Sequence, residues 1–272
     1  MEAQDEVSAV ACLNGALSAG MDFETLAPTL AKSALAHYND FGHSLIYLTH
    51  VRSLLARLGP DMAQPLLSAW TRSLVFATRE DLLPGFKAYG DALSTWPATV
   101  CPGEAAPPSA APFEALSVVQ TLAAAVEMAA RHPPQWLLQG LLDAAARHLL
   151  RFDESHAVRT DSPVTEDVGW LDFSHALTFG HAVRQVCLRQ PALWPRGLLQ
   201  LALFVGRNTP YLKPGLTSTA AYAAWRVDDA SAFDTLCQGI IDHGIGLDIF
   251  PAHRLKTRWR CATPSRSAWR RP

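Results

Sequence analysis

The chain has 272 residues, of which 49% are hydrophobic and 18% are charged, and its formal net charge at pH 7 is -2. This length and hydrophobic fraction suffice to bury a large core, which excludes a mainly disordered chain. A net charge so close to zero gives no basic surface for nucleic acid or for an anionic membrane, so we expect neither as a partner. A small molecule is the expected partner.

The cysteines and the N-terminus indicate the compartment. The five cysteines are widely spaced and form no Cys-x-x-Cys pair: Cys12, Cys101, Cys187, Cys237 and Cys261. Such a set argues against a disulfide framework and against a thiolate zinc site. Residues 1–6 are acidic where a targeting signal is basic, and no apolar run approaches the roughly 18 residues that span a bilayer. We therefore predict a cytoplasmic protein.

Helix-forming segments follow one another along the chain. Alanine- and leucine-rich segments with apolar residues at three- and four-residue spacing predict helices over 45–55, 66–76, 116–128, 136–150, 176–188 and 198–204. No convincing alternating Val, Ile and Thr run and no Asn-Gly hairpin signal occurs between them. The expected fold class is all-α, as a multi-helical single domain.

Two segments interrupt this pattern. Residues 96–112 hold five prolines and little periodicity, which predicts a Pro-rich internal loop between an N-terminal and a C-terminal helical group. Residues 258–272 carry five arginines and no apolar face, which predicts a solvated basic tail. The expected organisation is a helical domain over 1–257 followed by this tail.

Several common site motifs are missing from the sequence. There is no Gly-x-Gly-x-x-Gly after a strand, no P-loop and no Gly-x-Ser-x-Gly, so a Rossmann nucleotide site, phosphoryl transfer and an α/β-hydrolase site are unsupported. Neither the Glu-x-x-His of ferritin-like di-iron bundles nor the His-x-Asp of a facial triad occurs.

Histidines within apolar segments are the candidate site residues. His43 and His50 are seven residues apart, which places both on one face of a helix. Six residues separate His175 from His181, so their rings diverge by about 120° and we expect only His175 to face a shared site. His253 and Lys256 are three residues apart and share a face. Three separate segments are thus predicted to converge.

Each of these histidines taken alone also fits a hydrogen-bonded core residue. Their joint occurrence favours a site, because an unpaired polar group in a core costs roughly 1–3 kcal/mol. Four further histidines lie in polar or boundary contexts and are predicted to be surface or capping residues: His37, His132, His148 and His156.

Four segments in order resemble the questin oxidase-like family. They are residues 37–47, 72–82, 170–178, and 243–246 together with the His253-x-x-Lys256 pair. The resemblance extends from about residue 35 to residue 257.

This resemblance implies an oxidoreductase that uses dioxygen on an aromatic polyketide or quinone-like substrate. Family members are described as NADPH-requiring Baeyer-Villiger type monooxygenases, and at least one resembles a mononuclear non-haem iron dioxygenase with four histidines and a carboxylated lysine as ligands. Carried over by motif, His43, His175 and His253 resemble the histidine ligands of Fe(II), and Lys256 resembles the carboxylated lysine. Asp172 or Asp40 is expected to orient the imidazoles.

The chain departs from the family at both ends. The family has a further N-terminal helix with an Asn-His or His-His motif, whereas residues 1–36 contain no histidine. We expect His50, His181 or His243 to replace that ligand. Relatives continue into another apolar helix where this chain has its arginine-rich tail. Two alternatives stay open: a metal-free NADPH-dependent Baeyer-Villiger type monooxygenase, and an inactive or truncated helical scaffold.

Overall fold

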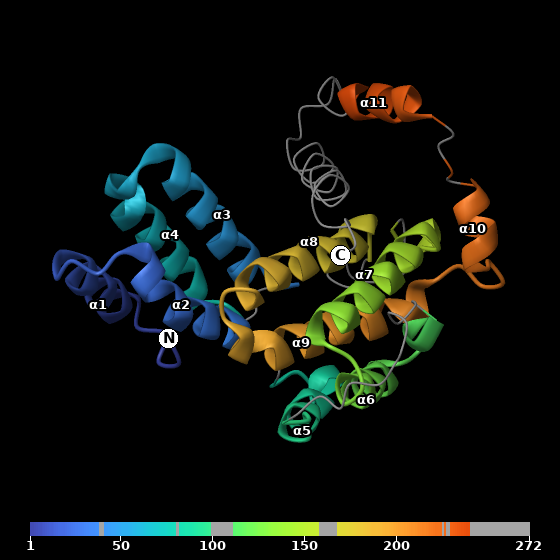
Figure 1. The fold of residues 1–272 in the computed structure, drawn as a ribbon, viewed down its shortest axis with the longest axis horizontal. Coiled ribbons are helices and arrows are strands. Elements are labelled where there is room, and N and C mark those ends of the chain that lie inside the picture. Colours follow the sequence, from blue (N-terminus) through green and yellow to red (C-terminus); the bar gives the residue numbers. More distant parts are fainter. Residues whose placement is uncertain are drawn as a thin grey trace.

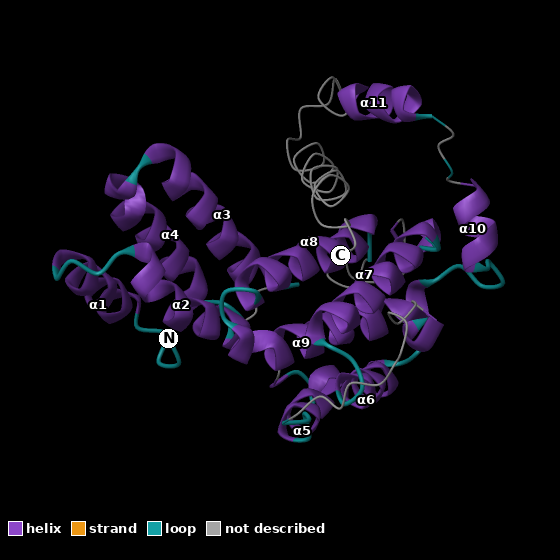
Figure 2. Cartoon of the chain, viewed as in Figure 1, coloured by secondary structure: helices purple, strands orange, loops and turns teal. Residues whose placement is uncertain are grey.

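The structure, a computed structural model, describes residues 1–37, 41–79, 82–98, 111–157, 168–224, 226 and 229–239. Within these ranges helices are joined by loops and turns, no strand forms, and one isolated bridge pairs Phe152 with Leu212 (Figure 2). The predicted all-α fold class is confirmed. None of the described helices combines the length and the apolar character that crossing a bilayer requires.

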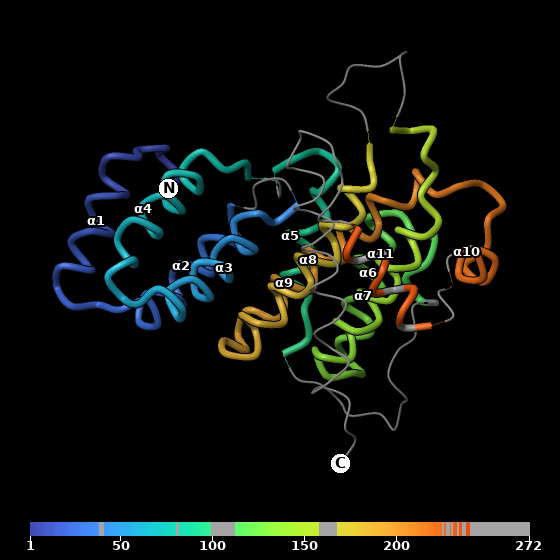
Figure 3. The backbone as a smooth tube through the Cα atoms, turned by 90° about the horizontal axis from the view of Figure 1, so that it is seen from above, coloured from blue at the N-terminus to red at the C-terminus, as the bar shows by residue number. Residues whose placement is uncertain are grey.

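The first four helices form one group, which lies at one end of the molecule (Figures 1 and 3). They are α1 (Glu6–Ser18), α2 (Phe23–Ala36), α3 (His43–Leu58) and α4 (Ala63–Val75). α1 packs against α4, and both α2 and α4 pack against α3. Aspartates begin α1 and α2, because the side chains of Asp5 and Asp22 accept hydrogen bonds from backbone amides of the first turn.

The second helical group surrounds two central helices, α8 and α9. Its elements are α5 (Ala88–Ser94), α6 (Val118–Ala129), α7 (Pro134–Leu150), α8 (Trp170–Cys187), α9 (Trp194–Asn208) and α10 (Ser218–Ala224). α11 (Ala230–Gly239) follows α10 in the chain and lies apart from the two central helices (Figure 1). Short 3-10 turns occupy Pro60–Met62, Pro84–Phe86, Ala111–Phe113, Glu154–Ala157, Pro191–Leu193 and Thr209–Tyr211. α8 packs against α3, α7 and α9, while α5, α6 and α7 also pack against α9. α8 therefore joins the two groups.

Each predicted helix overlaps a helix of the structure. The overlapping helices are α3, α4, α6, α7, α8 and α9. The ends differ by at most three residues in α3, α4, α6 and α7, whereas α8 begins six residues before its predicted start and α9 extends four residues beyond its predicted range at each end. The alanine and leucine pattern does not locate α1, α2, α5, α10 or α11. α1 and α2 mix Ser, Thr and Asn with their apolar residues, and α5 and α10 have only seven residues each.

One core cluster extends through both groups, from Leu13 in α1 to Val205 in α9. Of the predicted Pro-rich loop, residues 99–110 lie outside the described residues, as does the predicted tail over 258–272. Tyr89 before that loop and Phe113 after it both belong to the core cluster. Helical segments on either side of the loop therefore pack into the same core.

The backbones of α6 and α9 approach each other closely at Gly206. A methyl group placed on Gly206 of α9 would lie 2.6 Å from the Cα atom and 2.8 Å from the backbone nitrogen of Val118. Backbone atoms cannot move aside as a flexible side chain can. Position 206 therefore requires glycine for α6 and α9 to pack at this distance.

We expect Gly206→Ala to lower the free energy of unfolding by about 1–3 kcal/mol, because the added methyl group overpacks the contact between α6 and α9. Urea denaturation would measure the change. Gly15→Ala is the matched control, since Gly15 is also inside a helix but has nothing within 4 Å of its would-be Cβ atom. That variant should gain up to about 1 kcal/mol from helix propensity. Equal effects in the two variants would contradict the packing argument.

Candidate functional site

His43 and His175 meet where the beginning of α3 reaches α8. His43 is the first residue of α3 and is half-buried, whereas His175 lies in the second turn of α8 and is 6% exposed. Their Nε2 atoms are 3.0 Å apart, and the two rings meet edge to face at 70°. Two of the four predicted ligand residues are therefore in contact.

The hydrogen bond at the other ring nitrogen fixes the tautomer of neutral His175. Its Nδ1 atom lies 2.6 Å from the carbonyl oxygen of Leu171, one turn earlier on α8. A carbonyl oxygen can only accept, so Nδ1–H donates and Nε2 carries the lone pair. Two arrangements of His43 fit this contact. In the first, the Nε2–H group of His43 donates to Nε2 of His175. In the second, the Nε2 atoms of both residues carry lone pairs, and both lone pairs point at one cation.

The pair fits two positions of a metal site. Imidazole nitrogens about 2.1 Å from an ion and at a right angle to each other are about 3.0 Å apart. A histidine ligand usually donates its second ring N–H to a carbonyl or a carboxylate, as His175 does to Leu171. Within the described parts of the chain, no group of three His, Cys, Asp or Glu side chains is placed to hold a metal ion. His253 and Lys256 lie outside the described residues.

The expected replacements for the absent N-terminal ligand do not join the pair. His50 and His181 are described, yet neither forms a group of three with His43 and His175. His50 is seven residues, or about 10 Å, further along α3. His181 lies six residues after His175, about 120° around α8, and its Nε2 atom accepts a hydrogen bond from the amide of Gln185. The third candidate, His243, lies outside the described residues.

The ring of Phe41 lies against His175 and is itself contacted by a second ring and by one cation. The ring of Phe41 stacks on the imidazole, with centroids 5.6 Å apart and planes 19° apart, and also on the ring of Phe204 at 5.3 Å. The guanidinium carbon of Arg207 lies 4.3 Å from the centroid of the Phe41 ring. Arg207 in turn contacts Asp172, with 3.4 Å between Nη1 and Oδ1. Sequence reasoning did not identify Phe41 or Arg207 as site residues.

Asp172 has a different role from the one predicted. One of its carboxylate oxygens accepts a 2.7 Å hydrogen bond from the backbone amide of Gly169, which caps the start of α8, and the other contacts Arg207. The carbonyl of Leu171 is the group that orients His175. Because every residue has a backbone carbonyl, the identity of Leu171 does not reveal this role. Asp40, the other candidate, lies outside the described residues.

A left-handed turn places His43 at the beginning of α3. Phe41 has φ = 58° and Gly42 has φ = 81°. A Cβ atom on Gly42 would lie 2.1 Å from Cδ2 of Phe179, so only glycine allows this turn to rest on α8. The Phe41-Gly42-His43 sequence therefore determines where the imidazole of His43 meets α8.

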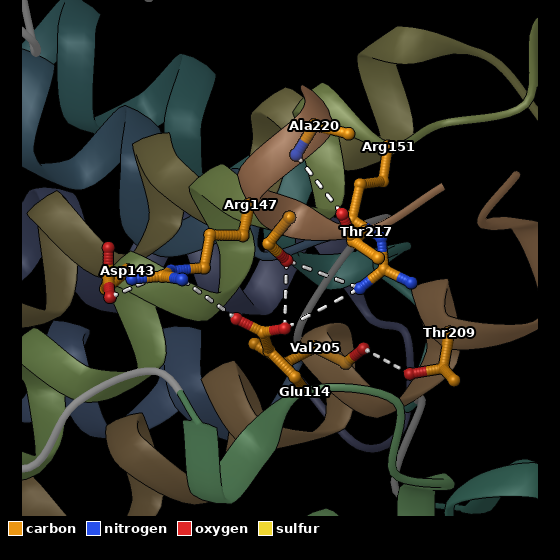
Figure 4. Close-up of polar contacts among 9 residues, drawn as sticks. Glu114, Asp143, Arg147, Arg151, Val205, Thr209, Thr217 and Ala220 are labelled. Atoms are coloured by element: carbon orange, nitrogen blue, oxygen red, sulfur yellow. Dashed lines mark hydrogen bonds and ion pairs between the residues drawn. The ribbon is translucent and has the colours of Figure 1, made fainter. Parts of the chain in front are cut away.

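A second polar cluster lies on α7, away from the histidine pair. Glu114 contacts Arg147 at 3.2 Å and Arg151 at 3.6 Å, and it accepts a 2.9 Å hydrogen bond from Ser218 at the start of α10 (Figure 4). Arg147 also contacts Asp143 on its own helix at 3.2 Å. This network fastens α10 and the segment before α6 to α7, which gives it a structural role.

Three of the four histidines that were predicted to be surface or capping residues are buried. They are His37, His132 and His148, whereas His156 is half-buried. His37 does cap the end of α2, and its Nε2 atom lies 2.9 Å from Oε1 of Glu2. Spacing would have identified His148, because it continues the buried face of α7 formed by Leu137, Leu141 and Ala144.

Burial is the main reason why the pKa of His148 falls to about 4, and the nearby Arg151 guanidinium lowers this pKa further. Glu114 and the backbone of Val205 oppose the shift. The imidazole is 0% exposed, so at neutral pH it is an uncharged component of the core.

Comparison with known proteins finds no matching family model and no significant match among curated proteins or solved structures. The family resemblance and the residue roles that it implies therefore stay predictions, and the geometry of the site carries the argument.

We expect acid to destabilise the fold through His148. The pKa of this group is about 4 in the folded protein and 6.5 for an ordinary histidine. Between these values the unfolded chain binds the proton and the folded protein does not, so the free energy of unfolding falls as pH decreases from 6.5 to about 4. The loss should be about 3 kcal/mol in total.

Urea denaturation across this pH range would measure the loss. His148→Phe removes the titrating group and keeps a ring in the core, so its unfolding free energy should fall less steeply than that of the wild type. Parallel pH curves for the two proteins would contradict the assignment to His148.

Proposed function

We propose that this chain is an oxygenase-type oxidoreductase whose mononuclear iron is bound by His43 and His175 together with His253 and Lys256. Its substrate in this proposal is an aromatic polyketide or a quinone-like molecule. The observation that carries the proposal is the 3.0 Å approach of two Nε2 atoms from residues 132 positions apart. The roles of His253 and Lys256 rest on the family resemblance alone.

The arrangement of His175 supports a ligand role. Its proton is committed to the carbonyl of Leu171, so the lone pair on Nε2 faces His43 without any further change of tautomer. His43 is half-buried, which leaves part of the pair accessible to a bound ion. A histidine pair that only fills the core would have no need of a surface accessible to an ion.

The surroundings suit an aromatic substrate. Phe41, Phe179 and Phe204 contact one another or the pair and provide apolar rings beside it. Such rings exclude water and stack on planar molecules. When bound, iron would supply the redox chemistry with dioxygen that these side chains cannot perform. The protein's own groups bind the ion, orient His175 and provide the apolar contact surface.

Lys256 would contribute only after reaction with carbon dioxide. Its amine forms a carbamate in the neutral state, which burial favours by lowering the pKa of a lysine. The carbamate oxygen is anionic and would complement the neutral imidazoles around Fe(II).

We expect the purified chain to contain iron and to lose most of it in His175→Ala, in His43→Ala and in Lys256→Ala, because each variant removes a proposed ligand. Elemental analysis by mass spectrometry gives the iron content per chain. His156→Ala is the matched control, since this half-buried histidine contacts Tyr211 and, within the described part of the chain, neither His43 nor His175. Full iron occupancy in Lys256→Ala would remove that residue from the site.

Oxygen uptake separates the proposal from its alternatives. With a phenolic quinone as substrate, we expect the iron-loaded chain to consume dioxygen and the chelator-treated chain to consume none. A monooxygenase uses two electrons from NADPH for each dioxygen, whereas a dioxygenase needs none, so the ratio of NADPH to dioxygen consumed identifies the class. NADPH oxidation by metal-free protein would instead favour the metal-free monooxygenase. A chain without metal and without either activity is a scaffold.

A further inference from the structure

We propose that Arg207 is a positioning residue that acts on His175 through the ring of Phe41. In this proposal the guanidinium of Arg207 holds the Phe41 ring flat on the imidazole, and this contact keeps Nε2 of His175 directed at His43. The inference rests on the proposed function only where metal affinity is used as a readout. The residues involved come from three elements: the turn before α3, α8 and α9.

The backbone of Phe41 indicates that its ring is held in place by other groups. Its φ of 58° lies in the left-handed region, which a residue with a large side chain rarely adopts. Such a conformation persists only where the surrounding structure enforces it. Phe41 is also two residues before His43, so relaxation of this turn would displace the first residue of α3.

Three contacts hold the ring. The imidazole of His175 and the ring of Phe204 lie nearly parallel to it, at 19° and 27°. The guanidinium of Arg207 is the third contact, and its distance of 4.3 Å from the ring centroid is well inside the range of a cation–π interaction. Arg207 is the only charged side chain that the described structure places over the ring of Phe41.

The position of Arg207 is itself fixed from α8. Asp172 contacts the guanidinium at 3.4 Å, and the backbone amide of Gly169 donates to the same carboxylate at 2.7 Å. Asp172 is three residues before His175 on α8, so one helix supplies both the anchor for Arg207 and the imidazole. The contacts form a closed loop from Asp172 to Arg207, to Phe41 and back to His175.

The hydrogen-bond contacts of His175 hold its two ring nitrogens, Nδ1 at the Leu171 carbonyl and Nε2 at His43. These two contacts do not by themselves set the tilt of the ring plane about the line that joins them. The stacked ring of Phe41 limits this tilt, because turning the imidazole would move its face toward the Phe41 ring. The direction of the Nε2 lone pair therefore depends on Phe41 and, through it, on Arg207.

Two measurements on the full chain test this role. Nitrogen-15 NMR of the metal-free protein reports the tautomer and the mobility of the His175 ring, and titration calorimetry with Co²⁺ alone reports the affinity of the pair for an ion. Arg207→Met keeps a long apolar side chain without the charge. The matched control is Arg189→Met, because Arg189 is exposed and donates to the carbonyl of Gln185, four residues earlier in the chain, rather than to a residue near the histidine pair.

We expect the wild type and Arg189→Met to show one His175 tautomer, protonated at Nδ1, and the same Co²⁺ affinity. Arg207→Met should show exchange between tautomers and bind Co²⁺ about tenfold more weakly, as is usual when a residue that orients a ligand is removed. Arg207→Lys restores a cation over the ring and should recover part of both properties. A purely structural ion pair would lower stability without changing the tautomer.

A wild-type tautomer and affinity in folded Arg207→Met would overturn the inference. If that variant does not fold, Phe41→Leu decides, since it keeps an apolar side chain but loses the flat ring, and unchanged His175 signals would overturn the inference as well. If the wild type binds no Co²⁺, the proposed function fails, while the tautomer comparison still decides the role of Arg207.

Discussion

The close packing of α8 against α9 is the contact on which the rest of the described structure depends. Each helix places a glycine against the other: a Cβ atom on Gly197 would lie 2.7 Å from Val183, and one on Gly180 would lie 3.2 Å from Leu201. Small residues at these points let the two helices approach closely enough for both to be buried along most of their length. Four further helices pack against this pair: α3, α5, α6 and α7. Through its contacts with α2 and α4, α3 connects the N-terminal helices to α8.

The sequence was sufficient to predict the helices that pack by regular apolar faces and to predict the meeting of His43 with His175. It was insufficient where contacts depend on backbone groups or on residues far apart. The carbonyl of Leu171 and the ring of Phe41 act on His175 through geometry that residue types do not encode. Arg207 occupies the last turn of α9, where a basic residue is ordinary, so nothing in its position predicts its place over Phe41.

The buried histidine of α7 shows how local context misleads. His148 follows Arg147 and precedes Arg151 by one turn, which is typical of a solvated helix end. Arg147 and Arg151 instead both form ion pairs with Glu114, and His148 faces the core. Periodicity along α7 is the more reliable guide here, because it reports the buried face regardless of the charges beside it.

His43 begins α3, which packs against α2 and α4 of the N-terminal group, whereas His175 belongs to the opposite helical group. α3 is roughly 24 Å long at 1.5 Å per residue, so a tilt of about 3° at its far end displaces its first residue by about 1 Å. The distance between the two Nε2 atoms therefore depends on how the N-terminal helices hold the far end of α3. Sequence changes in those helices would alter the contact between the two imidazoles.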